Sequence, residues 1–141
     1  MTRRRRLALG GLVALVGGSG VLHLAVPRPY RRIVPAPLAS WRNQLVAVSG
    51  VAEIGCALAL LVPRTRRVGA DATALLLVAV FPANVQMALD GGVVGVGFPA
   101  SSAVLAWLRL PLQVPLIWWA LSLRRDSRPA AASPAGSARP R

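Results

Sequence analysis

One carboxylic acid interrupts a long apolar stretch of this sequence. Glu53 lies near the middle of the segment 43–63, which in a helix would place it about 15 Å deep in a bilayer. An ionised carboxylate at that depth is costly unless a partner or water reaches it. Arg109, inside another apolar segment, is the partner that we predict. The two residues would either line a cavity that binds a polar head group or moves a proton, or only fix how the helices pack.

Three more polar side chains interrupt apolar segments and complete the predicted intramembrane cavity: His23, Asn84 and Gln113. We expect His23 to hydrogen-bond to Asn84 or to loop backbone. The alternative is a haem held by His23 and Met87. Cys56 is predicted to be a small packing residue.

The composition excludes several classes of site. The chain has one cysteine and one histidine, so it can form neither an internal disulfide nor a zinc site with four Cys or His ligands. It also lacks a nucleophile–base pair and a phosphate-binding glycine loop. We therefore assign no catalytic residue and no metal ligand, and we do not expect the chain alone to be an enzyme.

Four apolar segments must position these polar side chains, at residues 7–26, 43–63, 68–89 and 103–123. Each is long enough to cross a bilayer as a helix, which takes about 20 residues. The segments are continuously apolar rather than alternating, which argues against a β-barrel. The predicted fold is all-α, an integral membrane antiparallel four-helix bundle over residues 1–123.

The charge of the chain indicates its orientation in the membrane. Hydrophobic residues make up 55% of the sequence, and its net charge is +13, with all 17 basic residues being arginine. With four spans both termini share one side, which carries twelve arginines against four on the other, Arg109 lying within a span. The positive-inside rule then places both termini in the cytoplasm of a bacterial-type cell. Residues 124–141 are predicted to be a disordered basic cytoplasmic tail. No nucleic-acid partner is expected, because no soluble domain presents the arginines.

The two connections on the opposite side differ in character. Residues 27–41 contain four prolines, which disfavour a long helix, so we expect this segment to lie along the outer membrane surface or to dip between the helices. Its candidate contact residues are Tyr30, Arg31 and Arg32. Residues 91–102 are rich in glycine and serine, which predicts a flexible loop.

Short motifs in order along residues 15–120 resemble the DoxX family of small membrane proteins. They include Gly-Val-Leu-His-Leu-Ala-Val-Pro-Arg-Pro-Tyr at 20–30, Ser-Gly-Val-Ala-Glu at 49–53, Phe-Pro-Ala-Asn at 81–84 and Trp-Leu-Arg-Leu-Pro-Leu-Gln at 107–113. The resemblance implies a four-helix membrane bundle. It also implies kinship with DoxX, DoxD and MauE-like proteins, which are linked to redox systems that include quinone-coupled sulfur oxidation. The resemblance transfers no catalytic residue, and this chain lacks the paired cysteines of thiol-redox members.

Three functions stay open at this point. The first is an accessory or quinone-proximal subunit of a redox system, with a quinone as cofactor and a soluble or membrane oxidoreductase as partner. The second is a small membrane protein that binds or transports an organic solute or a proton. The third is a structural membrane scaffold. All three place the chain in a lipid bilayer and allow a homo-oligomer.

Overall fold

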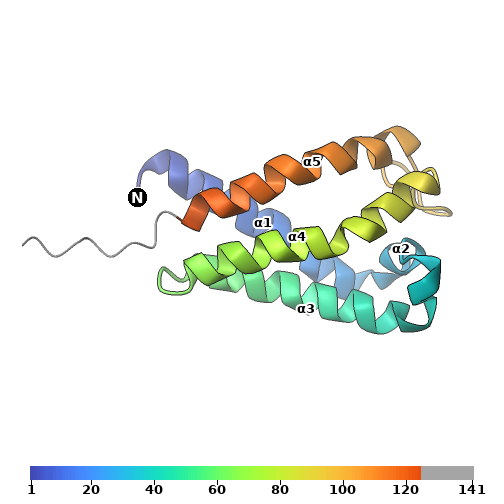
Figure 1. Ribbon diagram of the computed structural model, residues 1–141, viewed down its shortest axis with the longest axis horizontal. Helices are drawn as coiled ribbons and strands as arrows, with labels where there is room; N and C mark the ends of the chain where they lie inside the picture. Colours follow the sequence, from blue (N-terminus) through green and yellow to red (C-terminus); the bar gives the residue numbers. More distant parts are fainter. Residues whose placement is uncertain (125–141) are drawn as a thin grey trace, which may run out of the picture.

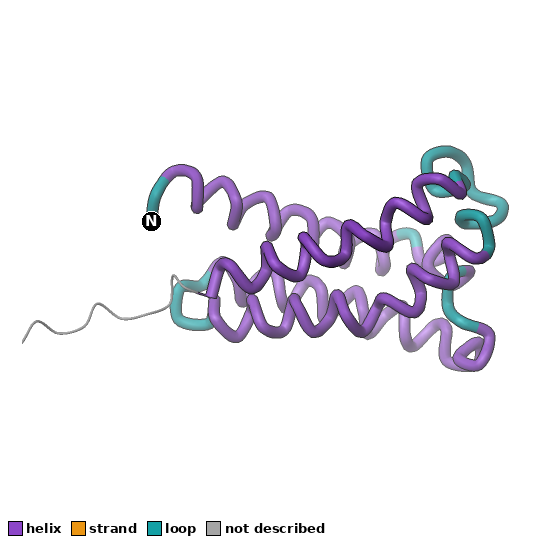
Figure 2. The backbone as a smooth tube through the Cα atoms, turned by 45° about the horizontal axis from the view of Figure 1, so that its top comes forward, coloured by secondary structure: helices purple, strands orange, loops and turns teal. Residues whose placement is uncertain are grey.

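A computed structural model describes residues 1–124, in which every regular element is a helix (Figures 1 and 2). The elements in chain order are α1 (Arg3–Ala25), α2 (Pro27–Arg32), the 3-10 helix η1 (Ala36–Trp41), α3 (Arg42–Leu61), α4 (Arg66–Leu89) and α5 (Ala103–Ser122). The prediction of an all-α helical bundle is confirmed. Most of the predicted basic tail, residues 125–141, lies outside the described residues.

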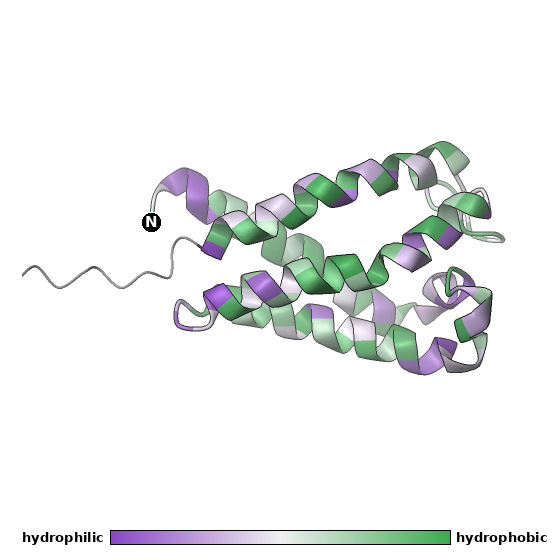
Figure 3. Ribbon diagram, viewed as in Figure 1, coloured by the Kyte–Doolittle hydropathy of each residue, from purple (hydrophilic) through white to green (hydrophobic). Residues whose placement is uncertain are grey.

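Four of these helices are long and apolar enough to cross a membrane, as a multi-pass membrane protein requires. They are α1, the continuous stretch Ala36–Leu61, α4 and α5. Large apolar side chains point outward along them, including Val48, Leu75 and Val114, which are 66%, 70% and 70% exposed. Figure 3 shows this apolar colouring along all four helices. Such a surface is unfavourable in water and suits contact with lipid.

The long helices pack as antiparallel neighbours in chain order. Helix α1 packs against α3, α3 against α4, and α4 against α5. We call the end with Met1, the turn 62–65 and Arg124 the terminal end, and the end with α2, η1 and residues 90–102 the distal end (Figure 1). Toward the distal end α5 runs away from α1, which passes behind α4 in this view.

Two buried apolar clusters hold the bundle together, one toward each end. The terminal cluster consists of Leu9, Leu12, Val16, Cys56, Leu60, Ala70, Ala74, Ala120 and Leu123. The distal cluster consists of Met87, Ala88, Val93 and Ala106. Two buried polar residues lie between the clusters: Asn84 follows Ala74 and precedes Met87 on α4, and Gln113 lies between Ala106 and Ala120 on α5. On α3 the buried Glu53 lies just before the terminal cluster, which begins there at Cys56. The bundle therefore has a polar layer that its apolar cores do not fill.

The two distal connections are both folded. Prolines occupy the first turns of α2 and η1, where their missing N–H groups cost nothing, so residues 27–41 form two short helices beside α3. Residues 90–102 form successive turns around Val93, which is 5% exposed and whose N–H donates to the Ala100 carbonyl at 2.8 Å. This packing differs from the flexible loop that the glycine content predicts.

Candidate functional site

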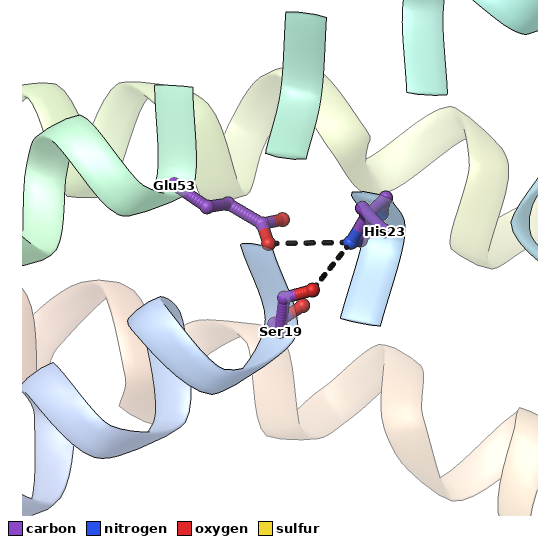
Figure 4. A network of polar contacts seen from close by, with 3 residues as sticks. All are labelled: Ser19, His23 and Glu53. Carbon is purple, nitrogen blue, oxygen red and sulfur yellow. Dashed lines mark hydrogen bonds and ion pairs between the residues drawn. The ribbon is translucent and has the colours of Figure 1, made fainter. Parts of the chain in front are cut away.

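The carboxylate of Glu53 lies against the imidazole of His23 where α1 crosses α3. Glu53 Oε2 is 3.3 Å from His23 Nδ1, and the same nitrogen is 2.8 Å from the backbone carbonyl oxygen of Ser19 (Figure 4). Glu53 is 7% exposed, and His23 is half-buried. Because a carbonyl oxygen only accepts hydrogen bonds, Nδ1 must carry a hydrogen. The carboxylate therefore faces the protonated nitrogen of the ring.

Two glycines allow the backbones of α1 and α3 to approach closely at this pair. A Cβ added at Gly20 would lie 2.6 Å from the Gly50 carbonyl oxygen and 2.9 Å from Glu53 Cβ. A Cβ added at Gly50 would lie 2.9 Å from His23 Cβ. Each polar residue stands three positions after the glycine of its own helix and contacts the glycine of the other. Small residues at such crossings are what close helix packing in membranes requires.

The short helix α2 folds over the pair and places an aromatic ring on it. The rings of Tyr30 and His23 are stacked, with centroids 3.8 Å apart and planes at 25°. Burial raises the pKa of the Tyr30 hydroxyl above its ordinary value, and the Glu53 carboxylate raises it further. The charge of Arg109 lowers the pKa of the same hydroxyl, so opposite charges act on Tyr30 from two helices.

Three buried polar atoms have no hydrogen-bond partner among the described residues, two of them at or one turn from the pair and the third on α2. They are Ser49 Oγ, Glu53 Oε2 and Arg31 Nε. Glu53 Oε2 has its ionic contact with His23, but this contact falls outside hydrogen-bond geometry. Ser49 lies one helical turn from Glu53 on α3. Buried polar groups are almost always hydrogen-bonded, so these atoms hold donor and acceptor capacity that the folded chain does not use.

The prediction that Arg109 pairs with Glu53 is wrong. Within the described chain Glu53 has its ion pair with His23, while Arg109 is exposed on α5. The physical reason is the packing order: α3 packs against α1, whereas α5 packs against α4. Depth along each span brings Glu53 and Arg109 to comparable levels, but depth does not decide which helices are neighbours.

Asn84 and Gln113 form a second polar pair, between α4 and α5. Asn84 Nδ2 donates to Gln113 Oε1 at 3.2 Å, and both residues are buried. Gln113 Nε2 also donates to the backbone carbonyl of Leu77, in the turn before Pro82. The predicted hydrogen bond between His23 and Asn84 is therefore wrong, since each has a partner on its own pair of helices.

A family described as "Domain of unknown function (DUF8561)" matches residues 12–124. The chain belongs to this family. The matched region of the DUF8561 chain contains both polar pairs and the covering helix α2. No curated protein and no solved structure matches it.

The other predicted contacts of the DUF8561 chain lie at its distal end. Tyr30 covers the His23–Glu53 pair, whereas Arg32 Nη1 donates to the carbonyl of Val94 and so ties α2 to the distal turns. Arg31 is half-buried. Over residues 1–124 no three His, Cys, Asp or Glu side chains gather as a metal site would require. The predicted residues thus fall into two separate polar pairs and a distal group instead of one cavity.

Three small residues that bring the first pair together or lie beside it are not conspicuous in the sequence. Gly20, Gly50 and Ser49 were not among the predicted site residues. The signal that would have found them is a repeated spacing: a glycine precedes His23 by three residues in one span, and another precedes Glu53 by three in the next. In antiparallel helices this spacing puts each polar side chain opposite the other helix's glycine.

Proposed function

We propose that this DUF8561 protein is an accessory membrane subunit of a redox system that binds the head group of a quinone beside the His23–Glu53 pair. The observation that carries the proposal is the buried pair with unused hydrogen-bonding atoms next to it, Ser49 Oγ and Glu53 Oε2. Ionisable residues at membrane depth usually have a function. The resemblance to DoxX proteins supports the redox assignment over a purely structural pair.

The residues present suit a head group that accepts hydrogen bonds in one redox state and donates them in the other. A bound quinone would supply two-electron chemistry that takes up and releases protons. The Ser49 hydroxyl can donate to a carbonyl oxygen or accept from a hydroxyl. The His23 imidazole and Glu53 carboxylate can hold the exchanged proton between them, since an imidazole and a carboxylate can each take up a proton and these two lie 3.3 Å apart.

The head group would approach the pair from the side that faces α5. The backbones of α1 and α3 are too close at Gly20 and Gly50 for a ring to pass between them. Helix α5 packs against α4 and runs away from α1 toward the distal end (Figure 1). Arg109 is exposed on α5, and its positive charge, which acts on Tyr30, would stabilise a negative charge that develops on the head group.

The orientation that we propose places both termini in the cytoplasm of a bacterial-type cell. The support is the asymmetry of the arginines, twelve of which belong to the terminal end or its tail and four to the distal end. In this orientation His23 lies near the outer end of its span and Glu53 lies near the middle of its own. A partner oxidoreductase that shares the quinone would then have access to it through the bilayer.

The proposal is tested by measuring quinone in the purified full-length protein. Protein extracted in a mild detergent is analysed by mass spectrometry for quinone per mole of protein, beside Glu53→Gln, His23→Gln and the control Asp71→Asn. Asp71 is a carboxylate on a membrane helix, but it pairs with Arg124 at 2.8 Å at the terminal end. We expect quinone in the natural protein and in Asp71→Asn, and about a tenfold lower content in the two site variants.

Two results would contradict this proposal. One is a natural protein without quinone. The other is an equal quinone content in Glu53→Gln and Asp71→Asn. If Glu53→Gln also changed cellular tolerance of an organic solute while protein levels stayed constant, the binding or transport function would replace the redox one.

A further inference from the structure

A second concave site opens at the distal end, away from the His23–Glu53 pair. It is a cavity of about 370 Å³ between the end of α2, the start of α3 and the turns 92–95. Its charged lining residues are Arg32, Arg42 and Asp90. Cavities of this size are typical of sites for small ligands.

The two arginines bring positive charge that the described chain does not neutralise. Arg32 Nη1 donates to the Val94 carbonyl, and Arg42 Nε donates to the Ala39 carbonyl at 2.9 Å. Neither guanidinium has an ion-pair partner among residues 1–124, and each keeps further N–H groups. Guanidinium groups that are fixed at one edge and free at the other suit the oxygens of a phosphate.

Asp90 supplies a negative charge to the cavity, and its carboxylate is only partly hydrogen-bonded. Asp90 Oδ1 accepts a hydrogen bond from Gln86 Nε2 at 2.9 Å. Its other oxygen keeps its capacity to accept. The cavity therefore offers cationic and anionic groups together, which is the complement of a zwitterion instead of a simple anion.

The turns that close the cavity are packed directly on one of its arginines. Gly95 has φ +71°, and a Cβ there would lie 2.6 Å from Arg32 Nη1. Glycine adopts this conformation readily, and any other residue at 95 would strain the backbone and displace the guanidinium. The position of Arg32 is thus set by backbone on one side and by the Val94 carbonyl on the other.

Exposed apolar side chains occur in the distal segments that form the cavity, at the end of the four spans. Trp41, Val94 and Phe98 are 61%, 70% and 82% exposed. Trp side chains with this exposure at the end of a membrane helix belong to the interface, at the level of the lipid head groups. A ligand in the cavity would therefore have its polar part on the arginines and apolar neighbours toward the bilayer.

We propose that this cavity binds the head group of an amine-bearing phospholipid, with the phosphate on Arg32 and Arg42 and the ammonium on Asp90. A lipid fits better than a free phosphate compound because the rim is apolar and lies at the end of the spans. The site does not depend on the proposed redox function, since no residue of the His23–Glu53 pair lines it.

The test uses native mass spectrometry of the full chain in mild detergent with added phosphatidylethanolamine or phosphatidylglycerol of equal chain length. We expect tighter retention of phosphatidylethanolamine. Arg42→Gln should weaken it about tenfold, because a charged hydrogen-bond partner is lost. Asp90→Asn should remove the preference for the amine while phosphatidylglycerol still binds. Arg28→Gln, an exposed arginine of α2 outside the cavity lining, is the matched control and should change nothing.

Arg42→Gln does not involve the hydrogen bond between Arg32 and the Val94 carbonyl. It therefore removes one positive charge from the cavity while α2 and the distal turns stay in contact. Size-exclusion profiles of all variants check the fold. Equal lipid retention by Arg42→Gln and Arg28→Gln would overturn the proposal, as would an unchanged lipid preference in Asp90→Asn. Displacement of the lipid by an equal concentration of free phosphoethanolamine would also overturn it, because the site would then take a soluble phosphate compound.

Discussion

At the scale of single residues, the chemistry of this protein is concentrated where His23 meets Glu53. Both side chains emerge next to a glycine contact, so the pair lies where two helix backbones are closest. Close backbones exclude lipid and water from one side of the pair and leave its other side toward Tyr30. The two glycines therefore hold the pair between closely packed backbones, and the Tyr30 ring covers His23.

Tyr30 offers a direct spectroscopic report on the charges of the site, because it is the only tyrosine in the chain. Its pKa lies above the ordinary value of 10.0 in the folded protein, mainly through burial. We expect Glu53→Gln to lower the pKa and Arg109→Gln to raise it further, since the carboxylate raises it and the guanidinium lowers it. The measurement is tyrosinate absorbance against pH, and equal midpoints in the natural protein and both variants would contradict the arrangement.

Because the pKa of Tyr30 is raised in the folded protein, the free energy of unfolding should decrease at alkaline pH. A raised folded-state pKa means that the fold favours the protonated phenol. This contribution to stability is complete below pH 10, the unfolded value, and is lost as the pH rises through the folded pKa. Tyr30→Phe keeps the ring stacked on His23 and should remove this alkaline loss from the unfolding free energy.

Removal of one partner from the buried pair should cost more than removal of both. His23→Leu leaves Glu53 without its ionic partner, and we expect a loss of about 3 kcal/mol in the free energy of unfolding. The double variant with Glu53→Leu should regain most of it, because an apolar pair needs no compensation. The values come from reversible unfolding in mixed detergent micelles. Additive losses would show that the two side chains do not interact.

The sequence could identify Glu53 and His23 as unusual, but not as partners. Any polar residue in an apolar span is conspicuous, and its depth follows from the helical rise. Which helix it meets depends on rotation and on the packing order, which small residues determine and hydropathy does not report. Arg109 therefore looked suitable by depth and by charge, although its helix packs elsewhere.

At the scale of elements, the contact between α1 and α3 depends on two glycines. Gly20→Val would bring side-chain atoms to within 2.9 Å of the Glu53 Cβ and 2.6 Å of the Gly50 carbonyl oxygen, so the helices must separate. We expect a loss of about 2 kcal/mol, in the range for overpacked cores, together with weaker quinone retention. The control is Gly18→Val on the same helix, where an added Cβ meets nothing within 4 Å. A similar loss in both variants would point to helix propensity as the cause.

The long helices were predictable because a bilayer demands continuous apolar segments of set length. The segments 68–89 and 103–123 and the helices α4 and α5 agree within two residues at each end. The distal turns were not predictable in this way. Glycine content signals freedom of the backbone, whereas Val93 and the glycines at positive φ are ordered by tertiary packing that a local pattern does not contain.

At the scale of the whole molecule, the proposed orientation predicts opposite labelling of the two ends. With Cys56 changed to Ser, single cysteines at Ser40 and Arg64 report on the distal and terminal ends, and both positions are exposed. We expect a membrane-impermeant thiol reagent to label Ser40→Cys in intact cells and Arg64→Cys only after permeabilisation. The reverse pattern would invert the topology and place the distal end, with His23 near it, on the cytoplasmic side.

The order of packing has a consequence for how the chain enters the membrane. Helices α1 and α3 form one hairpin and α4 and α5 another, and each hairpin contains its own buried polar pair, His23 with Glu53 and Asn84 with Gln113. Each half can therefore satisfy its costly groups during insertion, before it meets the other half. We therefore expect the two hairpins to enter the membrane one after the other and then to dock, so that the Glu53 carboxylate already has His23 beside it when it enters the lipid.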